Sequence, residues 1–316
     1  MKNYTTLADI HDLDGLIGEA RSLKSKNTAS NTGKGKTLGM LFFNPSLRTR
    51  LSTEKAAKLL GMEVMVMNAD KDGWALEFED GAIMNSDKAE HIKEAAAVLS
   101  QYCDIIAVRA FPGLKDKEKD ESEYVLNSFK KYASVPVVNL ESATGHPLQA
   151  LTDAMTIQEF NKAEKAKVVL SWAPHPKALP QSVANSFTEM MQRLDVDFVI
   201  TNPEGYDLDP DIRKDVKVEH DQEKAFKDAD FVYVKNWSSY ENYGQILDIK
   251  ENWTVNQAKL KNTNNAKVMH CLPVRRNVVI ADNVLDSENS IVIQQANNRT
   301  YAAQAVLKRI LECRKE

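Results

Sequence analysis

Four short segments of the chain carry side chains that bind anions or polarise carbonyl groups. The first is Ser46–Arg50, which follows a β-type stretch and an Asn-Pro turn. Ser46 can cap the helix that starts here, and the first backbone amides of a helix favour an anion. Thr49 adds a hydroxyl and Arg48 a fork of donors, so the segment resembles a phosphate cradle without a glycine-rich loop. A well-capped amphipathic helix with two surface arginines explains the same residues equally well.

The other three segments also follow β-type stretches. Arg109 ends one of them, and His146 is held between a glycine and a proline in the next. His146 and the nearby Gln149 can polarise a carbonyl and hold an amide-like group. The last segment places Cys271 close to Arg275. Taken singly, these residues are also explained by a surface arginine, a His-Pro turn that caps a helix, and a small buried thiol beside a solvated basic turn.

Alternating strands and helices are predicted over most of the chain. The strands, mostly near-continuous apolar runs, are expected at 37–43, 63–67, 104–109, 135–140, 167–173, 197–201, 216–220, 231–235 and 267–271. The main helices are expected at 46–60, 88–102, 148–160, 181–194 and 297–315. This alternation predicts parallel sheets, and ligands of such sheets bind outside the carboxyl ends of the strands. All four segments therefore lie where a single cleft could collect them.

The fold class predicted is α/β, with two domains that each have a mainly parallel central sheet flanked by helices. At about 150 residues per domain, the 316 residues allow two domains. The boundary is expected between residues 147 and 148, which gives a first domain at 1–147 and a second at 148–296. The C-terminal helix 297–316 is expected to pack back on the first domain. The proline-dense stretch 172–180 is expected to be an ordered loop.

Composition excludes several classes of protein. Charged residues make up 27% of the chain and its net charge is −4, so it has no general attraction for nucleic acid or anionic membranes. No apolar run approaches the ~20 residues of a membrane span, and the N-terminus lacks the apolar core of a signal peptide. The cysteines, Cys103, Cys271 and Cys313, are odd in number and lack metal-site spacing, which predicts reduced thiols, no metal and a cytoplasmic protein. Neither a dinucleotide fingerprint nor a P-loop is present, so no cofactor is predicted.

In order and separation, the four segments resemble those of the aspartate/ornithine carbamoyltransferase family. The family pattern is S-x-R-T-R, an arginine after a strand, H-P-x-Q and H-C-L-P, present here as Ser46–Arg50, Arg109, His146–Gln149 and His270–Pro273. The resemblance implies that the first domain binds carbamoyl phosphate, that the second binds an amino-group acceptor, and that the cleft between them is the active site. It also implies a homotrimer whose sites are shared between adjacent subunits.

The resemblance assigns roles residue by residue. The residues implied in catalysis are Thr49, Arg109, His146 and Cys271. Those implied in binding carbamoyl phosphate are Ser46, Leu47, Arg48, Thr49, Trp74, Arg109, His146, Gln149, Cys271, Leu272 and Arg299. Those implied in binding the acceptor are Ala89, Glu141, His175, Lys235, Leu272 and Arg275.

Two features resemble the branch of the family that uses N-acylated ornithine. The Ser-Met-Gly loop of ordinary ornithine carbamoyltransferases is missing, and the sequence instead has the proline-dense loop with His175, followed later by Lys235–Trp237. In that branch a later segment threads the proline-rich loop, which implies a knotted chain. A tryptophan of the neighbouring subunit also reaches the carbamoyl phosphate there, and Trp74 resembles that residue.

One short stretch bears on the acyl group of the acceptor. Enzymes of the branch that use acetylornithine have D-x-E-E-H, those that use succinylornithine have D-x-P-E-H, and this chain has Ala89 at the discriminating position of Asp87–His91. A small neutral residue would leave Arg275 available to a succinyl carboxylate, although a shift of register could bring in Glu90 instead. Gln304, where acetyl enzymes have a lysine, agrees with the succinyl assignment. The hypothesis is carbamoyl transfer to N-succinyl-L-ornithine in arginine biosynthesis; the alternatives are transfer to N-acetyl-L-ornithine and a non-catalytic carbamoyl phosphate-binding homologue.

Overall fold

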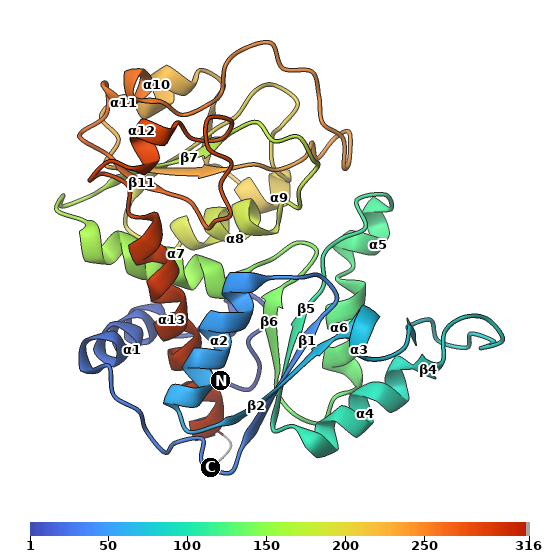
Figure 1. The fold of residues 1–316 in the computed structure, drawn as a ribbon. Coiled ribbons are helices and arrows are strands. Elements are labelled where there is room, and N and C mark those ends of the chain that lie inside the picture. The colour runs from blue at the N-terminus through green and yellow to red at the C-terminus, as the bar shows by residue number, and fades with distance from the viewer. Residues whose placement is uncertain (314–316) are drawn as a thin grey trace. The chain divides into compact units, whose positions relative to one another are not determined.

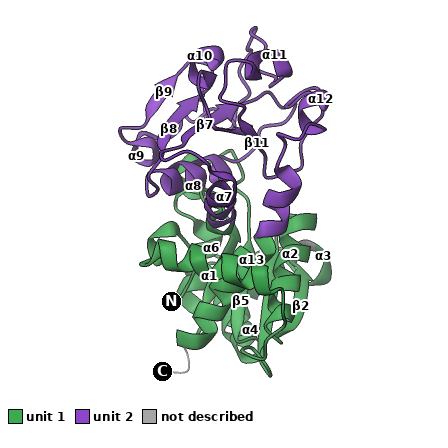
Figure 2. Ribbon diagram, turned by 90° about the vertical axis from the view of Figure 1, so that its left-hand side faces the viewer, with its two compact units in different colours: residues 1–148, 299–316 green, residues 149–298 purple. Residues whose placement is uncertain are grey.

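The computed structural model describes residues 1–313, and these form two compact units (Figure 1). The first unit comprises residues 1–148 and the chain from Arg299 onward, and the second comprises residues 149–298 (Figure 2). Each unit has its own parallel sheet with helices packed against it. The predicted fold class, two α/β domains with mainly parallel sheets, is confirmed.

Four parallel strands form the sheet of the first unit. They are β1 (Thr37–Phe42), β2 (Glu63–Asn68), β5 (Ile105–Arg109) and β6 (Val137–Glu141), in the order β2-β1-β5-β6. Every residue of β5 and β6 is buried, which explains why both read as continuous apolar runs. One face is covered by α4 (Ile92–Tyr102) and α6 (Tyr124–Tyr132), and the other by α1 (Leu13–Lys26), α2 (Leu47–Leu59) and the later part of α13 (Val292–Cys313) (Figure 1).

The register of the first sheet has one irregularity that bears on the site. Val108 pairs with Asn139, but the next residue, Arg109, pairs with Glu141, so Leu140 is passed over. A bulge of this kind re-aims the side chains around it. It places the arginine that ends β5 directly beside the carboxylate that ends β6. Short elements complete the unit: η1 (Leu7–Asp9), α3 (Ala69–Asp72), β3 (Leu76–Glu77), β4 (Glu90–His91) and α5 (Lys117–Glu121).

The second unit is built on five parallel strands. They are β7 (Lys167–Trp172), β8 (Asp197–Thr201), β9 (Lys217–Glu219), β10 (Phe231–Lys235) and β11 (Lys267–Met269), in the order β11-β10-β7-β8-β9. Its helices are α7 (Pro147–Phe160), α8 (Ser182–Met191), α9 (Pro210–Arg213), α10 (Gln222–Phe226), α11 (Gln257–Leu260), α12 (Asp282–Leu285) and the first turns of α13. The central strand β7 and its neighbour β10 are almost wholly buried.

Two helices start at residues other than those predicted. The helix expected over 88–102 begins only at Ile92, because the ring of His91 accepts a hydrogen bond from Lys93 N (3.2 Å) and so caps the helix there. The residues before it run extended, and β4 pairs with β3. The C-terminal helix starts at Val292 instead of 297, and residues 314 and 315 of the predicted helix lie outside the described residues.

The proline-dense loop after β7 is tied to the segment after β10. Ala173 N donates to Lys235 O (3.1 Å), Asn236 Nδ2 donates to Ala173 O (2.8 Å), and Ser238 N donates to Leu179 O (3.0 Å). The predicted ordered loop is therefore present, whereas the knotted course of the chain stays a prediction. Within residues 1–313, the model contains no helix with the length and apolar character that a membrane crossing requires.

Gly39 in β1 provides a test of how closely the first unit is packed. A Cβ built on Gly39 would lie 2.5 Å from Cys103 Sγ, closer than two such atoms can approach. We expect Gly39→Ala to lower the free energy of unfolding by about 1–3 kcal/mol, as overpacking usually does. Cys103→Ala in the same chain should recover most of that loss, as measured by urea unfolding. An equal loss in the single and double variants would contradict this packing.

Candidate active site

The start of α2 has the geometry of an anion site. Ser46 Oγ accepts a hydrogen bond from Thr49 N (3.3 Å), so the predicted cap is confirmed. Asn44 Oδ1 accepts one from Phe111 N (2.6 Å), which fixes the turn between β1 and the helix. Thr49 is buried, Arg48 is partly buried, and Leu47 is exposed. The first amides of the helix and its dipole therefore face the carboxyl edge of the sheet, where an anion would be favoured.

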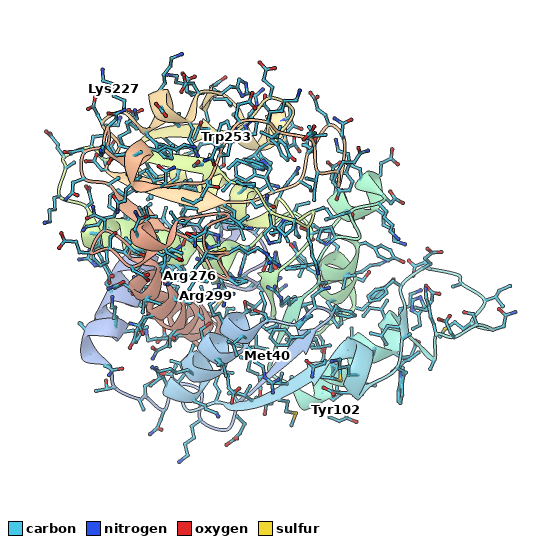
Figure 3. All side chains as sticks on the ribbon, turned by 45° about the horizontal axis from the view of Figure 1, so that its top comes forward. Met40, Tyr102, Lys227, Trp253, Arg276 and Arg299 are labelled. Atoms are coloured by element: carbon cyan, nitrogen blue, oxygen red, sulfur yellow. The ribbon has the colours of Figure 1, made fainter. Side chains whose placement is uncertain are left out.

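Five buried side chains form a continuous polar group in the first unit. Arg299 Nη2 donates to Thr49 Oγ1 (2.7 Å) and lies 3.5 Å from His146 Nε2. The same His146 nitrogen lies 3.6 Å from Glu141 Oε2, and Glu141 in turn forms an ion pair with Arg109. Each of the five is at most 8% exposed. We call this set the Thr49–Arg299 group; Figure 3 shows Arg299 projecting from α13.

The charges of the Thr49–Arg299 group favour a negatively charged ligand. The group contains two guanidinium groups, those of Arg109 and Arg299, and one carboxylate, that of Glu141, and all three are buried. Burial of a charge is costly unless a partner of opposite sign compensates it. The group therefore keeps a net positive charge next to the amino end of α2. It is suited to bind a phosphate and to stabilise negative charge on a polarised carbonyl oxygen.

The second unit holds Gln149 and the H-C-L-P segment in a buried network. The Oδ1 atom of Asp153, which is 0% exposed, accepts hydrogen bonds from Gln149 Nε2 and from Gln295 Nε2, both at 2.7 Å. Gln295 Oε1 accepts one from His270 N (2.9 Å), immediately before Cys271. One carboxylate thus orients two predicted site segments. The sequence analysis missed Asp153 and Gln295; Asp153 follows Gln149 by four residues, so both lie on one helix face, and this spacing is the signal that could have found it.

The pKa of Tyr233 is affected by the negative charge of that network. Burial, above all, and then the charges of Asp153 and Cys271 hold the pKa of the Tyr233 hydroxyl well above its usual value. A phenol that stays protonated is a hydrogen-bond donor at all physiological pH values. The Tyr233 hydroxyl therefore keeps its proton in this part of the second unit.

A second group in the second unit carries the residues predicted for the acceptor. Arg275 Nε donates to His175 Nε2 (3.1 Å), and His175 Nδ1 lies 3.0 Å from Lys177 O and 3.1 Å from Lys177 N. Burial chiefly, and the charges of Arg275 and Lys235 in addition, lower the pKa of His175 below its usual 6.5. Lys235 is buried, and its ammonium group donates to Asn236 O (2.9 Å). Leu272 N donates to His270 Nδ1 (2.8 Å), which fixes the backbone between these groups.

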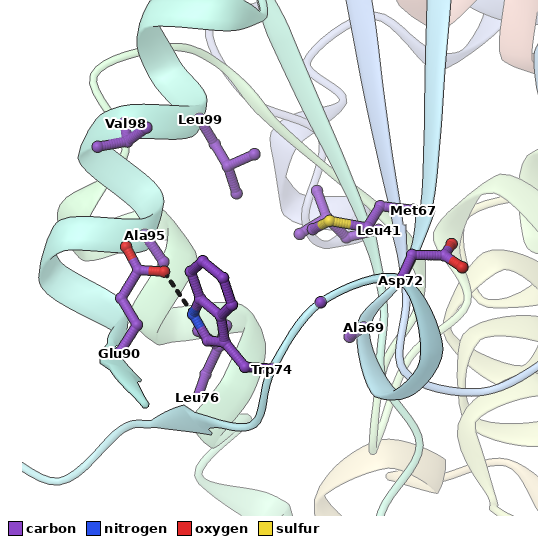
Figure 4. Close-up of a pocket in the computed structure, with 11 residues that line it drawn as sticks. Leu41, Met67, Ala69, Asp72, Trp74, Leu76, Glu90, Ala95, Val98 and Leu99 are labelled. Carbon is purple, nitrogen blue, oxygen red and sulfur yellow. Dashed lines mark hydrogen bonds between the residues drawn. The ribbon is translucent and has the colours of Figure 1, made fainter. Parts of the chain in front are cut away.

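Trp74 and Ala89 lie together on a different part of the first unit. Ala89 N donates to Ala75 O (3.1 Å) next to the β3–β4 pair, and Trp74 Nε1 donates to Glu90 Oε2 (2.8 Å) (Figure 4). Trp74 is 60% exposed and borders a largely apolar pocket beside α4. The loop that carries β4 projects on the α4 side of the sheet, away from α13 (Figure 1). The structure thus brings these two residues together, but apart from the Thr49–Arg299 group.

Two acidic residues hold this loop at its base. Glu77 accepts hydrogen bonds from the backbone of Glu79 and from Lys88 Nζ (2.9 Å), and these interactions lower its pKa to about 2. Asp80 is held by Lys93, Lys131 and Tyr132, which lower its pKa as well. Both carboxylates therefore stay ionised near neutral pH, and the loop keeps its anchors. In the part of the chain that the structure describes, no group of His, Cys, Asp or Glu residues has the arrangement of a metal site.

A buried cationic group at the carboxyl ends of parallel strands defines an anion-binding α/β protein of two units. Comparison with known protein families identifies the family within this class. Residues 2–159 match the family model described as aspartate/ornithine carbamoyltransferase, carbamoyl-P binding domain. Residues 180–310 match the model described as aspartate/ornithine carbamoyltransferase, Asp/Orn binding domain. The chain belongs to the aspartate/ornithine carbamoyltransferase family, and the resemblance of the four motifs is confirmed.

Curated relatives cover nearly the whole chain. It is 51% identical to an N-succinylornithine carbamoyltransferase of Bacteroides thetaiotaomicron over 99% of both chains. It is 39% identical to an N-acetylornithine carbamoyltransferase of Xylella fastidiosa over 94% of both. Among solved structures, it matches N-acetyl-L-ornithine transcarbamylase complexed with acetylcitrulline at a TM-score of 0.93 and 37% identity, covering 98% of this chain and 99% of the other.

A further solved structure is informative about the acyl group. It is a mutant of N-acetyl-L-ornithine transcarbamylase in which a glutamate is replaced by alanine, complexed with carbamyl phosphate and N-succinyl-L-norvaline. It matches this chain at a TM-score of 0.93 and 37% identity, covering 98% of this chain and all of the other. An acetylornithine enzyme therefore binds an N-succinyl compound in this altered form.

The His175–Arg275 contact predicts a specific titration. Because the Arg275 cation disfavours a second positive charge on the ring, Arg275→Met should raise the pKa of His175 from its lowered value towards 6.5. Arg276→Met is the matched control, since Arg276 is paired with Asp282 and Asp286 instead. NMR titration of the His175 ring measures both. An unchanged titration in Arg275→Met, or an equal shift in Arg276→Met, would contradict the contact.

Proposed function

We propose that this protein transfers the carbamoyl group of carbamoyl phosphate to the δ-amine of N-succinyl-L-ornithine, giving N-succinyl-L-citrulline and phosphate, in arginine biosynthesis. The observation that carries the carbamoyl transfer is the buried, positively charged Thr49–Arg299 group. The high identity to N-succinylornithine carbamoyltransferases over the full length supports the acceptor. Relatives that are named for N-acetylornithine support the alternative acceptor at lower identity.

Carbamoyl phosphate is held in this proposal by the first unit. Its phosphate lies at the amino end of α2, against Ser46, Leu47, Arg48 and Thr49, and is neutralised by Arg299. Arg109, His146 and Thr49 polarise the carbamoyl oxygen. The neutral δ-amine attacks the carbamoyl carbon, the bond from that carbon to the phosphate oxygen breaks, and the proton that the attacking nitrogen loses ends on the departing phosphate. Negative charge grows on the carbonyl oxygen during attack, and fixed donors stabilise it without reorganisation.

The acceptor is held in this proposal mainly by the second unit. Lys235 and Arg275 supply positive charges for the carboxylates of an acylated ornithine, and His175 supplies a neutral ring held against Arg275. Cys271 and Leu272 offer the backbone and the thiol of the H-C-L-P segment, whose position the Asp153 network fixes together with that of Gln149. Glu141 belongs to the first unit, where its contact with His146 would bring it near the reacting amine.

The preference for a succinyl group rests on Ala89 and Arg275. Ala89 is small, neutral and exposed on its loop. The carboxylate of the neighbouring Glu90 accepts the indole N–H of Trp74, which argues against Glu90 taking the place of the missing glutamate. Arg275 then remains for the distal succinyl carboxylate, which a guanidinium binds with two hydrogen bonds. The alanine-substituted acetylornithine enzyme that binds N-succinyl-L-norvaline is consistent with this assignment.

We also propose that the protein is a homotrimer in the cytoplasm. In a trimer, the exposed Trp74 would reach the carbamoyl phosphate site of the neighbouring subunit, as the resemblance implies. The exposure of this large aromatic side chain, on a loop anchored at its base by Glu77 and Asp80, supports such a role. An active monomer would exclude it.

Loss of a polarising group should strongly lower turnover without unfolding the protein. We expect Arg109→Ala and His146→Ala each to lower kcat for N-succinylornithine by about 10²–10³, the usual effect of removing one donor to a developing oxyanion. Arg21→Ala, which changes an exposed arginine of α1, is the control. Citrulline-type product formation and circular dichroism provide the measurements. Near-native turnover in either site variant would overturn the assignment.

The proposed roles of Ala89 and Arg275 predict that one substitution reverses the preference between the two acylated acceptors. The wild type should use N-succinylornithine well and N-acetylornithine and ornithine poorly. Ala89→Glu should reverse the order of the two acylated acceptors, because its carboxylate repels the succinyl group and competes for Arg275. Losing one partner of a hydrogen-bonded charge pair costs ~2–5 kcal/mol, enough for such a reversal.

Two further variants complete the acyl test. Ala89→Gln adds the same volume without the charge and should keep the succinyl preference. Arg275→Ala should lose succinylornithine use while carbamoyl phosphate binding is kept. Relative kcat/KM values for the three acceptors decide the outcome: a wild type that prefers N-acetylornithine would show that Glu90 or another group fills the role of the missing glutamate.

A further inference from the structure

Glu123 makes an unusual set of contacts next to the Thr49–Arg299 group. It stands between α5 and α6, in a stretch that the sequence analysis did not single out. Its carboxylate accepts hydrogen bonds from Ser142 Oγ (2.7 Å) and Thr144 N (2.8 Å), from Thr144 Oγ1, and at a longer distance from Ala143 N (3.3 Å). Four donors of a single turn therefore converge on one side chain from another part of the chain.

The turn that Glu123 holds carries two residues of the proposed site. It follows Glu141 directly and ends at Gly145, immediately before His146. Ser142 N donates to Gly145 O (2.8 Å), and Asn139 Nδ2 donates to Ser142 Oγ (2.9 Å), so the turn is closed on itself and tied to β6. The direction in which His146 leaves the sheet therefore depends on the bonds that fix residues 142–145.

The backbone of Glu123 is in a conformation that non-glycine residues rarely adopt. Its φ and ψ are 51° and 40°, in the left-handed region. It precedes α6, and its carbonyl accepts the bond from Asn127 N (2.8 Å), yet its side chain makes no capping bond to its own helix. A strained residue whose side chain is turned to another segment is the kind of feature that accompanies functional sites.

We infer that Glu123 is a positioning residue for His146: its carboxylate fixes the 142–145 turn so that the imidazole is held between Glu141 and Arg299. This inference deepens the proposed function and rests on it in so far as His146 polarises carbamoyl phosphate. Glu123 itself contacts the turn and not the Thr49–Arg299 group. Its effect on catalysis is therefore expected to pass through His146.

Three substitutions separate positioning from stability. Glu123→Gln keeps Oε1, which accepts three of the four bonds, and should retain most of kcat. Glu123→Ala removes the anchor and keeps the backbone strain, whereas Glu123→Gly removes the anchor and relieves the strain. We expect both to lower kcat by up to about 10², the effect of misplacing a catalytic group by roughly 1 Å. Glu123→Gly should nevertheless melt at a higher temperature than Glu123→Ala.

Kinetic constants provide the specific readout. KM for N-succinylornithine should stay near the wild-type value, because the acceptor is held mainly by the second unit. In a His146→Ala background, Glu123→Ala should cause no further loss of kcat, since a residue that acts through His146 has nothing left to position. Glu121→Ala, which removes a nearby exposed carboxylate that pairs with Lys117 in α5, is the matched control and should leave kcat unchanged.

Several outcomes would overturn the inference. Wild-type kcat in Glu123→Ala and Glu123→Gly would do so, as would a further loss in the His146→Ala background or an equal loss in Glu121→Ala. A loss of kcat that follows the fraction of folded protein, with Glu123→Gly no more stable than Glu123→Ala, would show that Glu123 serves folding alone.

The inference can fail separately from the proposed function. If the wild type carbamoylates none of the acceptors, the proposed function fails. The positioning is then still measured by hydrogen exchange and NMR of the full chain: in Glu123→Ala the amides of Ala143 and Thr144 should exchange faster and the ring resonances of His146 should move. Unchanged exchange and unchanged His146 resonances would overturn the positioning role, whatever the enzyme does.

Discussion

Two guanidinium groups are buried at the carboxyl edge of the first sheet, and much of the first unit is arranged to make this possible. Arg109 is compensated by Glu141, which the bulge between β5 and β6 brings directly opposite to it. Arg299 comes from the other end of the chain, 250 residues after Thr49, whose hydroxyl accepts its hydrogen bond. A buried arginine without such partners would cost several kcal/mol, so the sheet register and the packing of α13 are coupled to the charge of the site.

The second unit meets a similar demand with a different chemistry. Its network at Asp153 is built from side-chain amides and a carboxylate, and a single oxygen serves both Gln149 and Gln295. Amide groups do not titrate, so the donors of Gln149 and Gln295 are present over the whole pH range. Burial and Arg275 instead lower the pKa of His175, which leaves its ring able to accept a hydrogen bond.

The loop that we propose to carry acyl specificity is anchored apart from the buried charges. Glu77 and Asp80 hold the loop between α3 and α4 to its own surroundings. Local contacts therefore set the positions of Trp74 and Ala89. A change at position 89 can therefore alter what the loop excludes without disturbing the Thr49–Arg299 group.

The sequence by itself determined the fold class and the residues whose side chains can bind anions or polarise carbonyl groups, because both depend on local patterns. Buried parallel strands read as apolar runs, and an Asn-Pro-Ser turn before a helix predicts its cap, so β1, β5, β6, β7 and the start of α2 follow from short stretches. Only the tertiary structure decided which of these residues meet. The bulge at Leu140, the approach of Arg299 to His146, and the turn of Glu123 towards residues 142–144 each join segments far apart in the chain. Such contacts depend on sheet register and helix packing, which leave no periodic or local signal in a single sequence.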